Sequence, residues 1–93
     1  MHSQILQKIR EKIRNRQYVM TLHAEEEMED DDLSIFDVES GILTGSIRER
    51  QKDQGSGEWK YIVEGQTLDE DFIVVVAKFC ATQKVVMITV WRE

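Results

Sequence analysis

The sequence predicts an α+β domain in which helices cover one face of an antiparallel sheet of four to five strands. Three observations support this prediction. Residues 72–79 and 84–91 are two β-branched runs of strand length joined by a short polar link, which is typical of a central hairpin. Residues 46–53 and 58–64 flank a glycine-rich turn, which adds a second hairpin. Apolar residues before them recur at helical spacing, so the helices precede a four-strand meander.

Length and composition limit the class of protein. A chain of 93 residues has room for one hydrophobic core, so we expect a single domain over residues 1–93. The single cysteine, Cys80, excludes an internal disulfide and lies among apolar residues, which favours a buried thiol over a reactive one. No apolar run approaches the roughly 20 residues that span a bilayer, and residues 1–16 lack a signal peptide. We therefore expect a cytoplasmic protein with no membrane partner.

Charge is sorted along the chain, although its net value is −6. Residues 1–17 carry five bases and one acid, whereas residues 23–39 carry nine acids and no lysine or arginine. An acidic block of this size opposes phosphate contacts nearby, which argues against a generic nucleic-acid binder. Isoleucine and leucine recur at helical spacing over residues 3–16, so residues 1–17 are expected to form an amphipathic helical extension with a basic outer face.

A short strand and two helices are expected next. Alternation at residues 18–22 predicts a strand that joins one side of the sheet. An acidic helix with a thin apolar stripe follows from His23. Ser34 and Asp37 have the spacing of a capping box, so another helix begins there. We expect Gly45 to take the left-handed conformation just beyond its end.

Alternation in the two hairpins predicts which side chains share a face. Arg48, Arg50 and Lys52 fall on one face of a highly charged edge strand. The last strand is expected to divide between two faces, with Val86, Ile88 and Val90 on one and Val85, Met87, Thr89 and Trp91 on the other.

No established catalytic motif occurs in the sequence, which lacks a Walker loop, dinucleotide-binding glycines, a cysteine metal knuckle and a nucleophile elbow. His23 is the one interior side chain that titrates near neutral pH, so it is the candidate acid or base. The alternative is that it is a surface or capping group, which is common for a histidine at a helix start. Glu26 and Glu27 lie at metal-ligand spacing from His23, but no second histidine is near in the sequence. We therefore expect no metal and no cofactor.

The basic hairpin offers a second kind of site. Four cations lie on it, and three aromatic side chains are available for base stacking. The cations are Arg48, Arg50, Lys52 and Lys60, and the aromatic residues are Trp59, Tyr61 and Trp91. Together they predict a small RNA cleft on an otherwise acidic protein. The alternative is a charged edge strand beside aromatic residues that belong to the core.

Several segments resemble one protein family in their order and spacing. They are His23-Ala24 with Met28, Leu33-Ser34, Asp37-Val38, Gly45, Tyr61 to Val63 with Gly65, and Val86 to Trp91. Residues 18–92 therefore resemble domain of unknown function 4258, a bacterial family grouped with the RelE/ParE-like toxins and often encoded beside a zinc-finger antitoxin. The resemblance implies a RelE/ParE-like fold. It also implies the toxin of a type II toxin–antitoxin system, which cleaves mRNA on or off the ribosome.

The resemblance implies roles for individual residues as well. The implied catalytic set is His23 as acid or base with Lys60, Thr89 and Arg92, and the implied substrate-binding set is Arg48, Arg50 and Trp91. These roles require Thr89, Trp91 and Arg92 to face His23 across one pocket. The family pattern has arginine at two positions where this chain has Glu27 and Asp31. The change of sign beside His23 disfavours RNA there.

A non-catalytic interaction domain with a toxin-like fold is the alternative function. The segments 1–17 and 23–39 are opposite in charge, so they can meet between two copies of the chain or on a partner such as the antitoxin. The exposed edge strand is a further contact surface. This alternative needs no catalytic residue.

Overall fold

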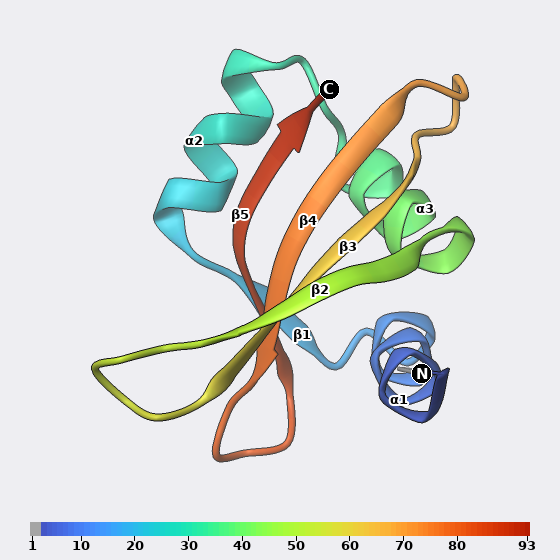
Figure 1. Cartoon of the computed structure of the whole chain (residues 1–93). Coiled ribbons are helices and arrows are strands. Elements are labelled where there is room, and N and C mark those ends of the chain that lie inside the picture. The colour runs from blue at the N-terminus through green and yellow to red at the C-terminus, as the bar shows by residue number, and fades with distance from the viewer. Residues whose placement is uncertain (1–2) are drawn as a thin grey trace.

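Three helices and five strands make up the structure, a computed structural model that describes residues 3–93 (Figure 1). The elements are α1 (Ser3–Arg14), β1 (Tyr18–Met20), α2 (Leu22–Asp30), α3 (Ile35–Thr44), β2 (Ser46–Lys52), β3 (Trp59–Gln66), β4 (Phe72–Phe79) and β5 (Val85–Arg92). The strands form one sheet in the order β1-β5-β4-β3-β2. The predicted α+β class and both hairpins are confirmed. Within residues 3–93, no helix has the length and apolar character needed to cross a membrane.

The sheet is mixed, so the prediction of an antiparallel sheet is wrong at one strand. β1 runs parallel to β5, with Tyr18 opposite Val85, while the other three strand pairs are antiparallel. The direction of β1 follows from the route of the chain, which passes from the end of α1 along β5 to the start of α2 (Figure 1). Alternation over so few residues indicates a strand but carries no information about its direction.

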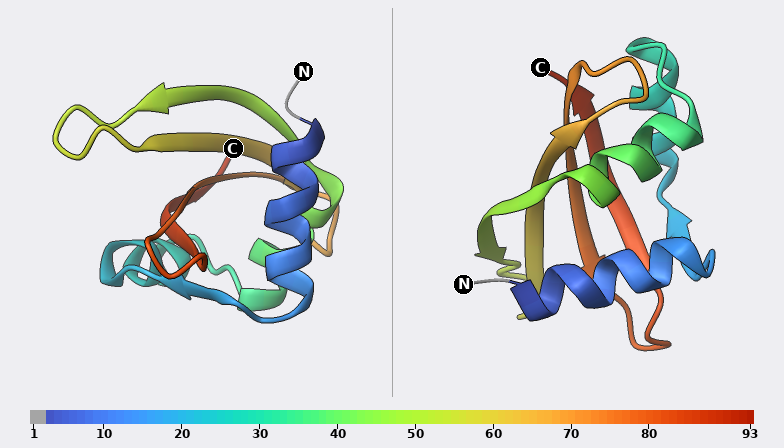
Figure 2. Two further views of the ribbon diagram at one scale, coloured as in Figure 1. Left: turned by 90° about the horizontal axis from the view of Figure 1, so that it is seen from below. Right: turned by 90° about the vertical axis from the view of Figure 1, so that its right-hand side faces the viewer.

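Helices α1 and α3 lie on the same side of the sheet, as Figure 2 shows, and α2 packs along β5. The core between these layers consists of buried apolar side chains, including Ile9, Ile13, Ala24, Val38, Ile42, Val63, Val75 and Met87. Because Ile9 and Ile13 are almost fully buried, α1 belongs to the same core as the rest of the chain.

Glycines allow α3 to pack directly on β3. A Cβ atom on Gly65 would lie 1.9 Å from the carbonyl oxygen of Gly41, which is far inside van der Waals contact. Gly45 has φ −90° and ψ −178°, so the expected left-handed conformation is wrong. Close approach explains the glycine instead, since a Cβ atom on Gly45 would lie 2.6 Å from the Glu64 carbonyl oxygen.

A β-bulge in β5 changes which of its side chains share a face. The register shifts between the pairs Val76–Thr89 and Ala77–Met87, which leaves Ile88 as the extra residue. The side chains that face the helices are Val85, Met87 and Val90, all fully buried. The predicted grouping of Val90 with Val86 and Ile88 is therefore wrong, because the bulge reverses the alternation after residue 88.

A second bulge falls at Arg48 in β2, between Ile47 and Glu49. Arg48 therefore points away from the helices, where its Nη1 lies 2.7 Å from Glu64 Oε2 and 3.0 Å from Glu93 Oε1. The prediction that Arg48 shares a face with Arg50 is wrong. Strands lie about 4.8 Å apart, so a flat sheet would separate β2 from β5 by roughly 14 Å. The Arg48–Glu93 contact forms because the strong twist of the sheet brings β2 across the face of the other strands (Figure 1).

Two local predictions have opposite outcomes. The capping box at the start of α3 is confirmed: the Asp37 N–H donates to Ser34 Oγ at 3.2 Å, and the Ser34 N–H donates to Asp37 Oδ2 at 3.0 Å. The prediction that Cys80 is buried is wrong, since this residue is half-buried in the β4–β5 turn. Its Sγ lies 2.9 Å from Thr82 Oγ1.

Candidate functional site

His23 lies in the first turn of α2, where Thr21 caps the helix by accepting a hydrogen bond from the Ala24 N–H at 3.1 Å. The His23 side chain is 65% exposed, and its Nε2 lies 3.3 Å from Glu27 Oε1 one turn further along. Within residues 3–93, this is the one imidazole–carboxylate contact shorter than 4.0 Å. The arrangement gives an exposed proton-transfer group with a carboxylate neighbour.

Helix α2 completes the outer edge of β5 where β1 ends. The Thr21 hydroxyl donates to the Ile88 carbonyl oxygen at 3.0 Å. Glu27 Oε1 then accepts from the Val90 N–H at 3.1 Å, and Asp31 Oδ2 accepts from the Arg92 N–H at 2.9 Å. Four residues of helix rise about 6 Å and two residues of strand about 6.6 Å, so the spacing of the carboxylates matches that of the N–H groups.

Glu27 and Asp31 therefore have a structural task that the sequence did not reveal. The resemblance implies arginine at these two positions, and an arginine side chain has no oxygen with which to accept these hydrogen bonds. Their four-residue spacing on one helix face was a signal, but their partners lie more than 60 residues away along the chain.

The Arg92 side chain ties two segments together. Its guanidinium donates to the carbonyl oxygens of Asp31 and Asp32 and pairs with the carboxylate of Asp71, which precedes β4. Arg92 thus contacts the end of α2, whereas His23 stands at its start, about 12 Å away along the helix axis. The structure does not bring these two predicted site residues together.

Lys60, Thr89 and Trp91 lie on the sheet face turned away from α1 and α3, which we call the open face. Thr89 is opposite Val76, and Trp91 is opposite Val74. The three site residues are half-buried, while Val74 is fully buried although no helix within residues 3–93 covers this face (Figure 1). The twist of the sheet and neighbouring side chains therefore enclose the centre of the open face.

Arg48 also lies on the open face, but its positive charge is already paired with two carboxylates. Hydrogen bonds to the carboxylates of Glu64 and Glu93 raise the pKa of its guanidinium. Both carboxylates contact Nη1, so they would compete with a phosphate for this guanidinium. Lys60 and Thr89 are thus the predicted catalytic residues that the open face presents together with Trp91.

Arg50 lies on the helix side of β2, separated from the other predicted site residues. Its Cζ is 4.2 Å from the centroid of the Trp59 ring, and Lys52 Nζ is 5.9 Å from the same centroid, both within cation–π range. Trp59 is 40% exposed, whereas Tyr61 is buried in the core. The aromatic residues predicted for one RNA cleft are therefore divided between the core and two faces of the sheet.

These features define a small α+β domain with a strongly twisted mixed sheet, helices on one side and an acidic helix bound along a sheet edge. In residues 3–93 no three His, Cys, Asp or Glu side chains come together as a metal site. Residues 20–92 match the family described as Domain of unknown function (DUF4258), and the chain belongs to this family. No curated protein and no solved structure gives a significant match. The predicted family is confirmed, and α1 precedes the matched region.

Proposed function

We propose that this domain is the toxin-like component of a type II toxin–antitoxin pair, with a RelE/ParE-like fold, and that it cleaves mRNA in the cytoplasm. Three findings support the proposal: membership of the DUF4258 family, a twisted sheet with helices on one side, and the exposed His23 beside Glu27. Its partner would be an antitoxin of the zinc-finger type.

The His23–Glu27 contact carries the chemical part of the proposal. In RNA cleavage the imidazole takes the proton of a ribose 2′-hydroxyl as the 2′-oxygen bonds to the adjacent phosphorus. The bond from phosphorus to the 5′-oxygen breaks, and His23 returns the proton to that oxygen. The products are a 2′,3′-cyclic phosphate and a 5′-hydroxyl end. Lys60 on the open face would hold the phosphate, and Trp91 would stack a base.

An mRNA cleavage assay with and without ribosomes tests this function. We expect His23→Ala to reduce cleavage by about a hundredfold or more, since a positioned acid or base contributes about that much. Glu26→Ala is the matched control, because Glu26 is an exposed carboxylate on the same helix that makes no hydrogen bond or ion pair in residues 3–93. Wild type without activity, or His23→Ala with full activity, would refute the nuclease.

A non-catalytic interaction domain is the second candidate, and the ion pairs of two arginines favour it. Arg48 is paired with Glu64 and Glu93, and Arg92 is paired with Asp71, so neither is free for a phosphate. The basic outer face of α1 and the acidic α2 would then contact a partner protein or a second copy. Light scattering at low and high salt tests this candidate, and a monomer at both salts with no co-purifying protein would count against it.

A further inference from the structure

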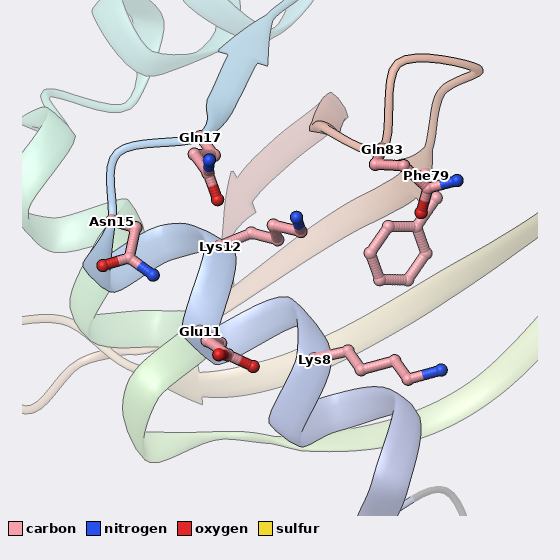
Figure 3. Close-up of a pocket in the computed structure, with 7 residues that line it drawn as sticks. All are labelled: Lys8, Glu11, Lys12, Asn15, Gln17, Phe79 and Gln83. Atoms are coloured by element: carbon pink, nitrogen blue, oxygen red, sulfur yellow. The ribbon is translucent and has the colours of Figure 1, made fainter.

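A hollow of about 280 Å³ lies between α1 and the β4–β5 turn (Figure 3). Its lining residues are Lys8, Glu11, Lys12, Asn15, Gln17, Phe79 and Gln83. Sites for drug-sized ligands start at about 300 Å³, so this hollow is just below that size and has room for a single ring system. The lining is polar except for the Phe79 ring, which lies between α1 and the turn in Figure 3.

The hollow has a positive rim. Lys8 and Lys12 are one helical turn apart on the same face of α1, and neither has a carboxylate within 4.0 Å in the described part of the chain. Glu11 is the one acid in the lining. Arg10, which lies between the two lysines in sequence, is on the opposite side of α1, where it donates to the carbonyl oxygens of Ile42 and Gly45 at the end of α3.

An aromatic and basic strip continues from the hollow along the sheet. Tyr61 and Ala77 are directly paired across β3 and β4. Trp59 and Phe79 lie two residues beyond this pair on their own strands, so both rings are on the helix side. Phe79 is half-buried and packs against the core, whereas Trp59 is exposed. Arg50 and Lys52 lie over the Trp59 ring. The half-buried Phe79 ring, the exposed Trp59 ring and the cations over it thus lie on the same side of the sheet.

The acidic block does not reach this surface. α1, the tip of the β2–β3 hairpin and the β4–β5 turn lie at one end of the molecule, and α2 lies at the other (Figure 1). The net charge of −6 therefore conceals a molecule with one basic and one acidic end. A basic surface with aromatic rings suits a polyanion with accessible flat bases. Bases inside a duplex are stacked on each other, so a single strand fits better than a double helix.

We propose that the hollow and the adjoining Arg50–Trp59 strip bind single-stranded nucleic acid. One base enters the hollow against Phe79, Lys8 and Lys12 hold the phosphates beside it, and a neighbouring base stacks on Trp59. The site lies apart from His23 and does not depend on catalysis. It adds to the proposed function a second contact surface for the RNA strand, apart from the contacts proposed for Lys60 and Trp91 on the open face.

Fluorescence anisotropy with labelled oligonucleotides of about ten nucleotides tests the site. The probes are an RNA, a DNA of the same sequence and the corresponding duplex. Lys12→Glu is compared with Arg14→Glu, which makes the same charge change on α1 outside the hollow. Trp59→Ala removes the exposed ring. Circular dichroism establishes that each variant is folded.

We expect wild type to bind the single strands, with affinity falling as salt rises. Lys12→Glu should weaken binding by about tenfold, Arg14→Glu by less than threefold, and Trp59→Ala by at least about fivefold because a stacked base is lost. If RNA binds more tightly than DNA, the site also contacts the 2′-hydroxyl group. If the two bind equally, the site recognises bases and phosphates alone. Both results support the site. No binding, equal effects of Lys12→Glu and Arg14→Glu, or equally tight duplex binding would overturn it.

Binding and cleavage can fail separately. A strand bound through Lys12 and Trp59 but left uncut supports this surface and refutes the nuclease. Cleavage that depends on His23 but is unchanged in Lys12→Glu and Trp59→Ala supports the nuclease and overturns this surface.

Discussion

Glu27 and Val90 are joined by a hydrogen bond of 3.1 Å, from the backbone N–H of β5 to a carboxylate of α2. The same carboxylate lies 3.3 Å from the His23 imidazole. One acid thus joins the sheet edge to the only candidate catalytic base of residues 3–93. Its removal should affect stability and proton transfer together, and these effects can be distinguished.

Glu27→Ala should lower the free energy of unfolding by about 1–3 kcal/mol, because the Val90 N–H loses its acceptor. Glu27→Gln keeps a side-chain oxygen and should restore most of that stability. Urea unfolding measures both variants, with Glu26→Ala as the exposed control, expected within about 0.5 kcal/mol of wild type. Equal stability of the Ala and Gln variants would contradict the assigned hydrogen bond.

Gly65→Ala should destabilise the fold by about 1–3 kcal/mol or prevent folding, since the added Cβ would lie 1.9 Å from the Gly41 carbonyl oxygen. The control is Gly55→Ala in the β2–β3 turn, where the nearest atom would be 3.4 Å away. Thermal unfolding of the two variants should separate them clearly. A Gly65→Ala protein as stable as wild type would mean that α3 does not lie this close to β3.

Asp37 should make the domain sensitive to acid. Hydrogen bonds from the backbone of Ser34 and Leu68 lower the pKa of this carboxyl, so the folded state favours its charged form. The stability it contributes is present above its ordinary pKa of 3.8 and is lost as the pH falls below that value. Asp37→Ala should lower the free energy of unfolding by about 1 kcal/mol near neutral pH, and this difference from wild type should shrink in acid.

The stability that Tyr18 contributes should depend on pH in the opposite sense. Its partial burial and its hydrogen bond to Glu39 Oε2, 2.6 Å long, raise its pKa to about 12. The folded state therefore favours the neutral phenol, and the associated stability is full below pH 10 and lost as the pH rises toward 12. Wild type should lose stability relative to Tyr18→Phe over this range. A constant difference in the free energy of unfolding between the two proteins from pH 10 to pH 12 would refute the raised pKa.

Cys80 should react faster with iodoacetamide at neutral pH than an ordinary thiol. The hydrogen bond from Thr82 lowers the pKa of the thiol by stabilising the thiolate. Thr82→Val keeps the shape of the side chain and removes the hydroxyl, so it should move the midpoint of the pH–rate curve upward. A midpoint that is the same in both proteins would show that the turn does not activate the sulfur.

Local sequence signals predicted the elements of this fold well. The capping box of Ser34 and Asp37 acts within four residues, and the glycine-rich turn and the apolar runs of β4 and β5 are continuous in the sequence. Each of these features depends on neighbours along the chain. That is why composition and spacing were sufficient to identify them.

The candidate site was harder to predict because it depends on distant pairings. The bulges at Arg48 and Ile88 reversed the expected faces of several site residues, and no local residue type marks either bulge. Arg92 was expected to hold phosphate but is bound to α2 and Asp71. The sequence predicted a cleft with Trp59 on the basic hairpin, whereas the hollow is lined largely by residues of α1, which the predicted site did not include.

The parallel pairing of β1 with β5 also constrains how the domain is made. Residues 18–20 leave the ribosome well before residues 85–87, so β1 has no partner strand while everything between them is being translated. The isoleucines of α1 likewise have only part of their apolar surroundings during that time. Stable folding must therefore wait until β5 has emerged, and a nascent chain halted before residue 85 should remain open to proteases.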